Sequence, residues 1–153
     1  DVEAIDISDV AIELAQIRAL ESGLDIDWGV ADLETHPLPV QGYDIVVVSR
    51  FLLRNRLADL AEALRPGGTL LYEQHVLPGL ASGTLDVGDT RAPGDALPPG
   101  VGGPRSARFR LAPNELLKSF SSLELAYYYE GVLPDPDGQP MLLARLVGRR
   151  GAA

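Results

Sequence analysis

Apolar residues occur along this chain in short groups that are separated by glycine, proline and polar residues. Alternating or continuously apolar groups predict strands, whereas apolar residues three and four positions apart predict helices. The order of elements expected from this pattern predicts an α/β fold with a mainly parallel sheet. The expected strands are residues 2–5, 25–31, 45–48, 69–73, 123–131 and 141–148, and the expected helices are 9–22, 54–64 and 114–120.

Several of these boundaries coincide with residues that favour the end of an element. Ser8 suits the N-cap of the first helix, and Gly23 suits the left-handed position that follows it. The β-branched run at residues 45–48 is typical of a strand that is buried on both faces of a parallel sheet. The Asp-Pro-Asp-Gly turn at 135–138 joins the last two strands, so we expect an antiparallel C-terminal strand.

Polar side chains follow the carboxyl ends of the expected strands, where open α/β sheets bind their ligands. Asp6 follows the first strand, and the two oxygens of its carboxylate match two vicinal ribose hydroxyls. Asp32 follows the second strand and could accept a hydrogen bond from an adenine amine, with Leu33 covering the ring. Both aspartates also fit a simpler interpretation, as turn or capping residues.

Composition and charge narrow the possible functions. The length fits one domain, expected at residues 1–150 with a tail at 151–153, and the Gly- and Pro-rich residues 78–105 predict a flexible loop. The formal charge of −9 argues against sequence-independent binding to nucleic acid, which needs clustered cations. No apolar run is long enough to span a bilayer, no signal peptide pattern is visible and cysteine is absent. This pattern fits a cytoplasmic protein.

Three stretches read Ala-Ile-Asp-Ile-Ser at 4–8, Val-Ala-Asp at 30–32 and Tyr-Asp-Ile-Val-Val-Val at 43–48, and a fourth follows at 64–70. Taken in this order, the four stretches resemble class I S-adenosylmethionine-dependent methyltransferases. Leu-Arg-Pro-Gly-Gly-Thr-Leu at 64–70 is the most specific of them, because it lies between an expected helix and an expected strand as in that family. The resemblance implies a Rossmann-like sheet, S-adenosylmethionine as cofactor and a small-molecule acceptor.

A narrower likeness lies within that class. Residues 50–54, 72–73 and 108–116 look like a bacterial small-molecule branch near the tellurite-resistance type. Leu53 stands where some of those relatives carry His, so the acid–base role of that position is not carried over.

The resemblance also assigns cofactor contacts to three pairs of residues at three strand ends. They are Asp6 and Ile7 for the ribose hydroxyls and the adenine, Asp32 and Leu33 for the adenine amine and ring, and Ser49 and Arg50 for the methionine side.

Methyl transfer needs mainly alignment, because the sulfonium of the cofactor is already activated. No catalytic triad is required, and the sequence contains no convincing one. Tyr72, Glu73 and His75 lie at the end of an expected strand and are candidates to orient or deprotonate the acceptor. The alternative for His75 is a loop histidine without a catalytic role.

The chain departs from the family at its start. The Gly-rich cofactor loop of the family follows a strand that would precede Val2 and that lies between the strands expected at 2–5 and 45–48. We therefore expect that the first strand and first helix are missing and that this sequence is truncated. Buried backbone groups without partners cost about 1–3 kcal/mol each, so the truncated chain is expected to bind cofactor poorly or to be inactive.

Two other functions remain open. Asp6 and Asp32 would serve a nicotinamide dinucleotide equally well, but a short-chain dehydrogenase needs Tyr four residues before Lys. The only lysine, Lys118, has Asn114 at that spacing. The other alternative is a non-catalytic, degenerate domain that binds a partner or stabilises an oligomer. The identity of the acceptor and the oligomeric state stay open.

Overall fold

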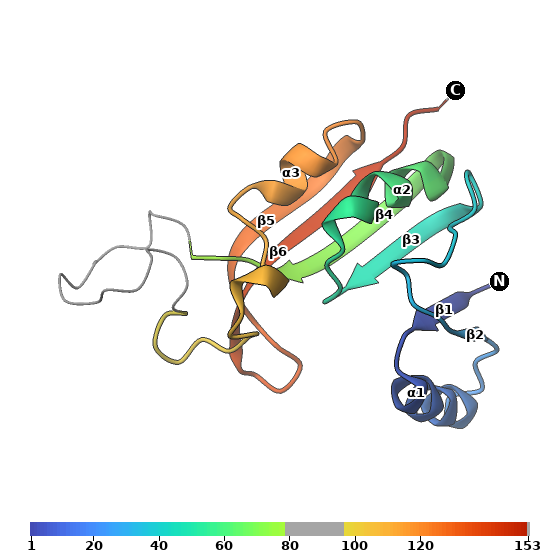
Figure 1. Ribbon diagram of the computed structural model, residues 1–153, viewed down its shortest axis with the longest axis horizontal. Helices are drawn as coiled ribbons and strands as arrows, with labels where there is room; N and C mark the ends of the chain where they lie inside the picture. Colours follow the sequence, from blue (N-terminus) through green and yellow to red (C-terminus); the bar gives the residue numbers. More distant parts are fainter. Residues whose placement is uncertain (79–96, 153) are drawn as a thin grey trace. The chain divides into compact units, whose positions relative to one another are not determined.

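The computed structural model describes residues 1–78 and 97–152 (Figure 1). Residues 79–96, which make up most of the expected flexible loop, therefore lie outside the described residues. The chain forms two compact units, Asp1–Leu38 and Pro39–Ala153, and each is described by itself. The single domain expected from the length stays a prediction.

The first unit is a strand–helix–strand arrangement. Its elements are β1 (Glu3–Asp6), α1 (Asp9–Glu21) and β2 (Asp27–Val30). The two strands pair in parallel, so their carboxyl ends lie at the same edge of this small sheet. The strand, helix and strand predicted for this part of the sequence are confirmed.

The two ends of α1 follow from the residues at its boundaries. The hydroxyl of Ser8 accepts a hydrogen bond of 3.2 Å from the backbone N–H of Ala11, which caps the first turn. Gly23 follows the helix with φ 66°, a left-handed conformation that glycine adopts without steric cost. Both boundary predictions are confirmed.

The second unit contains a four-stranded sheet with the strand order β3–β4–β6–β5. Its strands are β3 (Tyr43–Ser49), β4 (Leu64–His75), β5 (Glu124–Pro134) and β6 (Pro140–Arg149). β3 and β4 pair in parallel, whereas β6 lies antiparallel between β4 and β5. The sheet is therefore mixed, and the predicted antiparallel C-terminal strand is confirmed.

The helices of the second unit lie on one face of this sheet. α2 (Leu57–Ala63) follows a 3₁₀ turn, η1 (Arg54–Arg56), while α3 (Glu115–Ser119) follows a second one, η2 (Ala107–Phe109). Figure 1 shows α2 and α3 in front of the same face of the sheet. The core under them includes Leu57, Leu60, Leu64, Leu70, Tyr72, Leu116 and Phe120.

The opposite face of the sheet keeps large apolar side chains exposed. Because side chains alternate along a strand, odd-numbered residues of β4 point away from the helices. Leu71 on β4 is 39% exposed, and its neighbours in the strand register are Val47 and Val147. The other large exposed apolar residues on the neighbouring strands include Ile45, Tyr127 and Tyr129.

β4 differs from its prediction because it begins at Leu64 rather than at residue 69. The helix was expected to stop at the Pro-Gly-Gly sequence 66–68, but α2 ends at Ala63 and this sequence lies inside β4. It forms a bulge there, because the register passes from Tyr43–Leu64 to Ile45–Thr69. A Cβ at Gly68 would lie 2.9 Å from the carbonyl oxygen of Arg65, so only glycine fits this bulge.

Candidate cofactor-binding site

Two exposed carboxylates lie at the carboxyl edge of the β1–β2 sheet. Asp6 is the last residue of β1, and Asp32 lies two residues beyond the end of β2. The backbone N–H of Ala31 donates to the carbonyl oxygen of Asp6 over 3.0 Å, which extends the strand pairing to this point. The structure thus places at one sheet edge the two aspartates that the sequence singled out.

Each of these carboxylates has one oxygen engaged in a local turn. Oδ1 of Asp6 accepts from the N–H of Ser8 over 2.8 Å, and Oδ1 of Asp32 accepts from the N–H of Glu34 over 2.9 Å. These are the bonds that the turn interpretation requires. Within the described residues, Oδ2 of Asp6 and of Asp32 has no partner, so each carboxylate keeps acceptor capacity for a ligand. The turn role and the ligand role are therefore compatible.

The apolar residue after each aspartate is placed beside it. Ile7 is 68% exposed at the end of β1, and Leu33 is half-buried after Asp32. An apolar side chain next to each carboxylate suits contact with a planar ring, and the adenine contacts of these two residues stay predictions.

The last two candidate residues lie at the end of β3, in the second unit. Ser49 is exposed, and Arg50 follows it with φ 56°, a left-handed conformation that is uncommon for residues other than glycine. The backbone N–H of Arg50 donates to the carbonyl oxygen of Glu73 over 2.9 Å. Four of the six candidate cofactor residues therefore lie in the first unit, and Ser49 and Arg50 lie in the second.

The side chain of Arg50 belongs to an ionic network at this sheet edge. Its Nε donates to Oε1 of Glu73 over 3.0 Å, and its Nη2 donates to Oδ1 of Asp135 over 2.8 Å. Nε of Arg145 donates to the second oxygen of Glu73, Oε2, over 2.7 Å. Burial acts to raise the pKa of Glu73, but the hydrogen bonds and charges of Arg145 and Arg50 outweigh burial and lower that pKa. Glu73 is therefore an ionised carboxylate at neutral pH.

Tyr72 points to the helix-covered face of β4, away from Glu73. It is 2% exposed, its hydroxyl donates to the carbonyl oxygen of Phe51 over 2.7 Å, and its ring meets Phe120 edge-on with 5.7 Å between the centroids. Burial raises the pKa of Tyr72, and the negative charge of Glu115 raises it further. Tyr72 is thus a neutral hydrogen-bond donor within the core.

His75 ends β4 on the same face as Glu73 and is almost buried. Its ring packs so close to Gly103 that a Cβ there would lie 3.1 Å from Nδ1. Burial and the positive charge of Arg50 lower the pKa of His75, so its imidazole is neutral at pH 7. The catalytic roles of His75, Tyr72 and Glu73 stay predictions.

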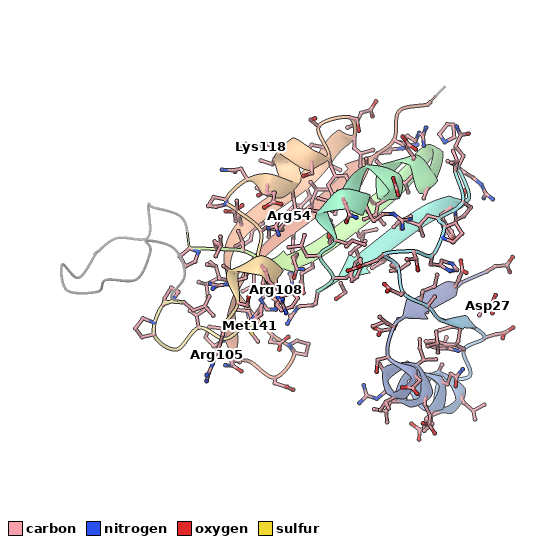
Figure 2. The ribbon with its side chains drawn as sticks, viewed as in Figure 1. Asp27, Arg54, Arg105, Arg108, Lys118 and Met141 are labelled. Atoms are coloured by element: carbon pink, nitrogen blue, oxygen red, sulfur yellow. The ribbon has the colours of Figure 1, made fainter. Side chains whose placement is uncertain are left out.

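Arg54 connects η1 to the segment that leads into α3 (Figure 2). Its Nε and Nη2 donate to the two oxygens of Glu115 over 2.6 and 3.1 Å. The guanidinium also donates to the carbonyl oxygens of Arg108 over 3.2 Å and of Arg110 over 2.7 Å. Arg54 and Glu115 lie in two of the stretches that carry the narrower family likeness, and the structure brings these two stretches into contact.

The Arg54–Glu115 pair predicts a pH dependence of stability. Burial acts to raise the pKa of Glu115, but hydrogen bonds from Arg54 and from the Ala112 N–H, with the charge of Arg54, lower it below the ordinary 4.5. Because the folded pKa is depressed, the stabilisation is complete above pH 4.5 and is lost as pH falls through the lowered pKa. We expect the stability difference between wild type and Glu115→Gln, measured by urea unfolding at several pH values, to shrink below pH 4.5. Glu124→Gln, at an exposed glutamate, is the control, and a difference that is constant with pH would contradict this assignment.

Three residues of these networks were not singled out by the sequence analysis. Asp135 was expected to serve only as a turn residue, Arg145 lay in an expected strand without a role, and Glu115 was only part of the stretch 108–116 that carries the narrower likeness. One signal could have pointed to Arg145. It is a cation in an expected strand in which the residues before and after it are apolar. The partners of Asp135 and Glu115 have no comparable local signal.

Residues 1–68 match the methyltransferase domain family. The matched stretch contains all six candidate cofactor residues and the Pro-Gly-Gly bulge of β4. This stretch is therefore similar to a class I S-adenosylmethionine-dependent methyltransferase domain. The family resemblance expected from the sequence is thereby confirmed over residues 1–68.

A curated relative is the ubiquinone/menaquinone biosynthesis C-methyltransferase of Bordetella parapertussis, which is 36% identical over 77 residues. The alignment covers 46% of this chain, and the chain spans 30% of the length of that relative.

Solved methyltransferase structures share the fold of this chain. TehB from Haemophilus influenzae matches 98% of it with a TM-score of 0.66 and 20% identity, and 50% of TehB is covered. An S-adenosylmethionine-dependent methyltransferase from Methanosarcina mazei matches 99% of it with a TM-score of 0.66 and 16% identity, and 82% of that protein is covered. These likenesses establish the α/β methyltransferase fold with its mixed sheet.

Within residues 1–78 and 97–152, no group of three or more His, Cys, Asp or Glu side chains is arranged to hold a metal ion. Over the same part of the chain, no helix is both long enough and apolar enough to cross a membrane.

Proposed function

We propose that this protein transfers a methyl group from S-adenosylmethionine to a small-molecule acceptor. The observation that carries the proposal is the pair of carboxylates, Asp6 and Asp32, at the carboxyl edge of the β1–β2 sheet, inside the stretch that matches the methyltransferase domain family. Their open oxygens suit the hydrogen-bond donors of a nucleoside. Ribose hydroxyls would donate to Asp6, and the adenine amine would donate to Asp32.

Ser49 and Arg50, at the end of β3, are the candidates for contact with the methionine side of the cofactor. When bound, S-adenosylmethionine supplies an activated sulfonium methyl group. The residues of the chain then need mainly to hold the acceptor in line with that methyl group and to exclude competing orientations. His75 carries a neutral imidazole at pH 7, so it could accept a proton from an acceptor hydroxyl or amine.

A small-molecule acceptor fits the charge of the chain. The formal charge of −9 disfavours a nucleic acid as acceptor. A polyanion of that kind binds mainly to clustered cationic side chains, which displace its counterions. Because the curated relative is a C-methyltransferase, carbon acceptors are the first class to test, followed by nitrogen and oxygen acceptors.

Isothermal titration with S-adenosylmethionine tests the cofactor half of the proposal. We expect the purified protein to bind with a dissociation constant between about 1 µM and 1 mM, which is the usual range of KM for enzyme substrates. NADH in the same titration is the control. Binding of NADH in place of S-adenosylmethionine would support the nicotinamide alternative, and binding of neither would overturn the proposed function.

Transfer of a tritiated methyl group from S-adenosylmethionine tests the second half of the proposal, which is methylation of a small-molecule acceptor. Label should pass to a small-molecule fraction of a cell extract and not to its nucleic-acid fraction. Cofactor binding without transfer to any fraction would favour the non-catalytic alternative.

A further inference from the structure

The loop that leaves β3, residues 49–51, is held by two consecutive residues of the neighbouring strand β4. Tyr72 and Glu73 point to opposite faces of the sheet, because side chains alternate along a strand. Each of them binds a different residue of this loop, which we name the β3 exit loop. The loop is therefore fixed from both faces of the sheet.

Glu73 holds Arg50 through both its backbone and its side chain. The carbonyl oxygen of Glu73 accepts from the Arg50 N–H over 2.9 Å, and its Oε1 accepts from Arg50 Nε over 3.0 Å. Arg145 donates to the remaining carboxylate oxygen over 2.7 Å and so fixes the orientation of Glu73. Both oxygens of Glu73 are therefore occupied by guanidinium groups.

The guanidinium of Arg50 is matched by carboxylates within the second unit. Its Nη2 donates to Asp135, in the turn between β5 and β6, over 2.8 Å. Two arginines, Arg50 and Arg145, thus face two carboxylates, Glu73 and Asp135, and the formal charges of the four groups cancel. A carboxylate on a ligand would have to compete with Glu73 and Asp135 for Arg50.

Tyr72 holds the next residue of the loop from the other face. Its hydroxyl donates to the carbonyl oxygen of Phe51 over 2.7 Å, and its ring is packed against Phe120 in the core. Because the hydroxyl is buried and already donates to a carbonyl oxygen, it is not placed to give its proton to a substrate. This contact makes Tyr72 a support for the loop.

The conformation of Arg50 explains why such support is needed. A φ of 56° in a residue with a side chain is a sparsely populated conformation, and it persists only where surrounding contacts hold it. The hydrogen bonds to Glu73 and Asp135 supply those contacts. If they were removed, the loop would be free to relax into a more extended path.

We propose that Glu73 and Tyr72 are positioning residues for cofactor binding, which act by fixing the β3 exit loop, and that Arg50 gives this loop its shape without donating its charge to the cofactor. The inference rests on the proposed function, because it assumes that the loop contacts S-adenosylmethionine. It replaces acid–base roles for Tyr72 and Glu73 with a structural action on the cofactor site.

The test measures two properties of the protein. The first is hydrogen exchange of the Arg50 backbone amide by NMR without any ligand, and the second is the dissociation constant of S-adenosylmethionine by calorimetry. The variants are Glu73→Gln, Tyr72→Phe and Asp135→Asn, so that the test survives if one of them does not fold. The matched controls are Glu124→Gln and Tyr129→Phe, which alter exposed residues of β5.

We expect Glu73→Gln to speed exchange of the Arg50 amide and to weaken cofactor binding, each by about tenfold, because charge-assisted hydrogen bonds to the loop are lost. Tyr72→Phe and Asp135→Asn should change both properties in the same direction by about threefold to tenfold. The control variants should match wild type in both measurements.

Three results would overturn the proposal. Unchanged amide exchange in all the folded variants would mean that Glu73 and Tyr72 do not fix the loop. Faster exchange with unchanged affinity would mean that the fixed loop does not serve the cofactor. Tighter binding by Glu73→Gln would mean that the released Arg50 guanidinium binds the ligand directly.

A failure of the proposed function would be distinguishable from a failure of this inference. If wild type itself does not bind S-adenosylmethionine, the proposed function fails and this inference fails with it. If wild type binds and the variants bind equally well, only the positioning role is lost.

Discussion

Replacement of Asp6 by alanine is expected to weaken S-adenosylmethionine binding about 100-fold, and replacement by asparagine about tenfold. A hydrogen bond to a charged group contributes about 1.5–3 kcal/mol, and each 1.4 kcal/mol is a factor of ten in affinity. Loss of the two hydrogen bonds that the ribose hydroxyls would donate to Asp6 should therefore lower the affinity by about two factors of ten. Isothermal titration of the purified variants measures the change directly.

The asparagine variant separates the ligand role of Asp6 from its turn role. Oδ1 of Asp6 accepts from the Ser8 N–H, and an asparagine carbonyl can accept the same bond and keep the turn before α1. The variant then lacks only the negative charge and one acceptor atom. A loss of affinity with unchanged thermal stability would assign the effect to ligand binding.

Asp27 offers a matched control on the same pair of strands. It is an exposed aspartate at the amino end of β2, whereas Asp6 lies at the carboxyl end of β1 (Figure 2). Asp27→Asn changes the net charge of the first unit by the same amount. Equal losses of affinity in Asp6→Asn and Asp27→Asn would mean that general electrostatics, and not a specific contact, governs binding, and the ribose role of Asp6 would fail.

The fold could be predicted from the sequence wherever local rules decide it. Ser8 and Gly23 determine the ends of α1 through cap geometry, and the turn at 135–138 determines the hairpin of the last two strands. The candidate carboxylates Asp6 and Asp32 were found for the same reason, because each follows a recognisable strand directly. The local sequence pattern is therefore enough to place these two residues at the edge of a sheet.

Partners that are distant in the sequence could not be predicted in this way. Arg50 meets Asp135 across 85 positions, and Arg145 meets Glu73 across 72 positions. Such contacts depend on the strand order and on the register between β4 and β6, which hydrophobic periodicity does not specify. The bulge at 65–68 is another case, because it depends on the close approach of Gly68 to the backbone of β3.

Alternation along β4 could have refined the candidate catalytic group. Tyr72 was grouped with Glu73 and His75 because the three residues are close in sequence. Consecutive strand residues point to opposite faces, so the strand assignment alone places Tyr72 away from the other two. Its burial under α3 and its bond to Phe51 then follow from the position of the helices.

Leu70→Ala is expected to lower the free energy of unfolding by about 2–5 kcal/mol, as measured by urea denaturation followed by circular dichroism. Leu70 is 0% exposed on the face of β4 that α2 and α3 cover. The truncation removes packing contacts and leaves a cavity between the sheet and the helices, which the surrounding residues fill only in part. The loss should appear as a lower midpoint with an unchanged slope, because the surface exposed on unfolding stays nearly the same.

Leu71→Ala is the matched variant, at the next position of the same strand and with the same change of side chain. Leu71 is 39% exposed on the opposite face, so its truncation leaves no closed cavity and should cost at most about 1 kcal/mol. The contrast between the two variants measures which face of the sheet is covered in solution. If Leu71→Ala were as destabilising as Leu70→Ala, the face that carries Ile45, Val47 and Leu71 would be covered in solution, and the one-sided packing described for this sheet would be wrong.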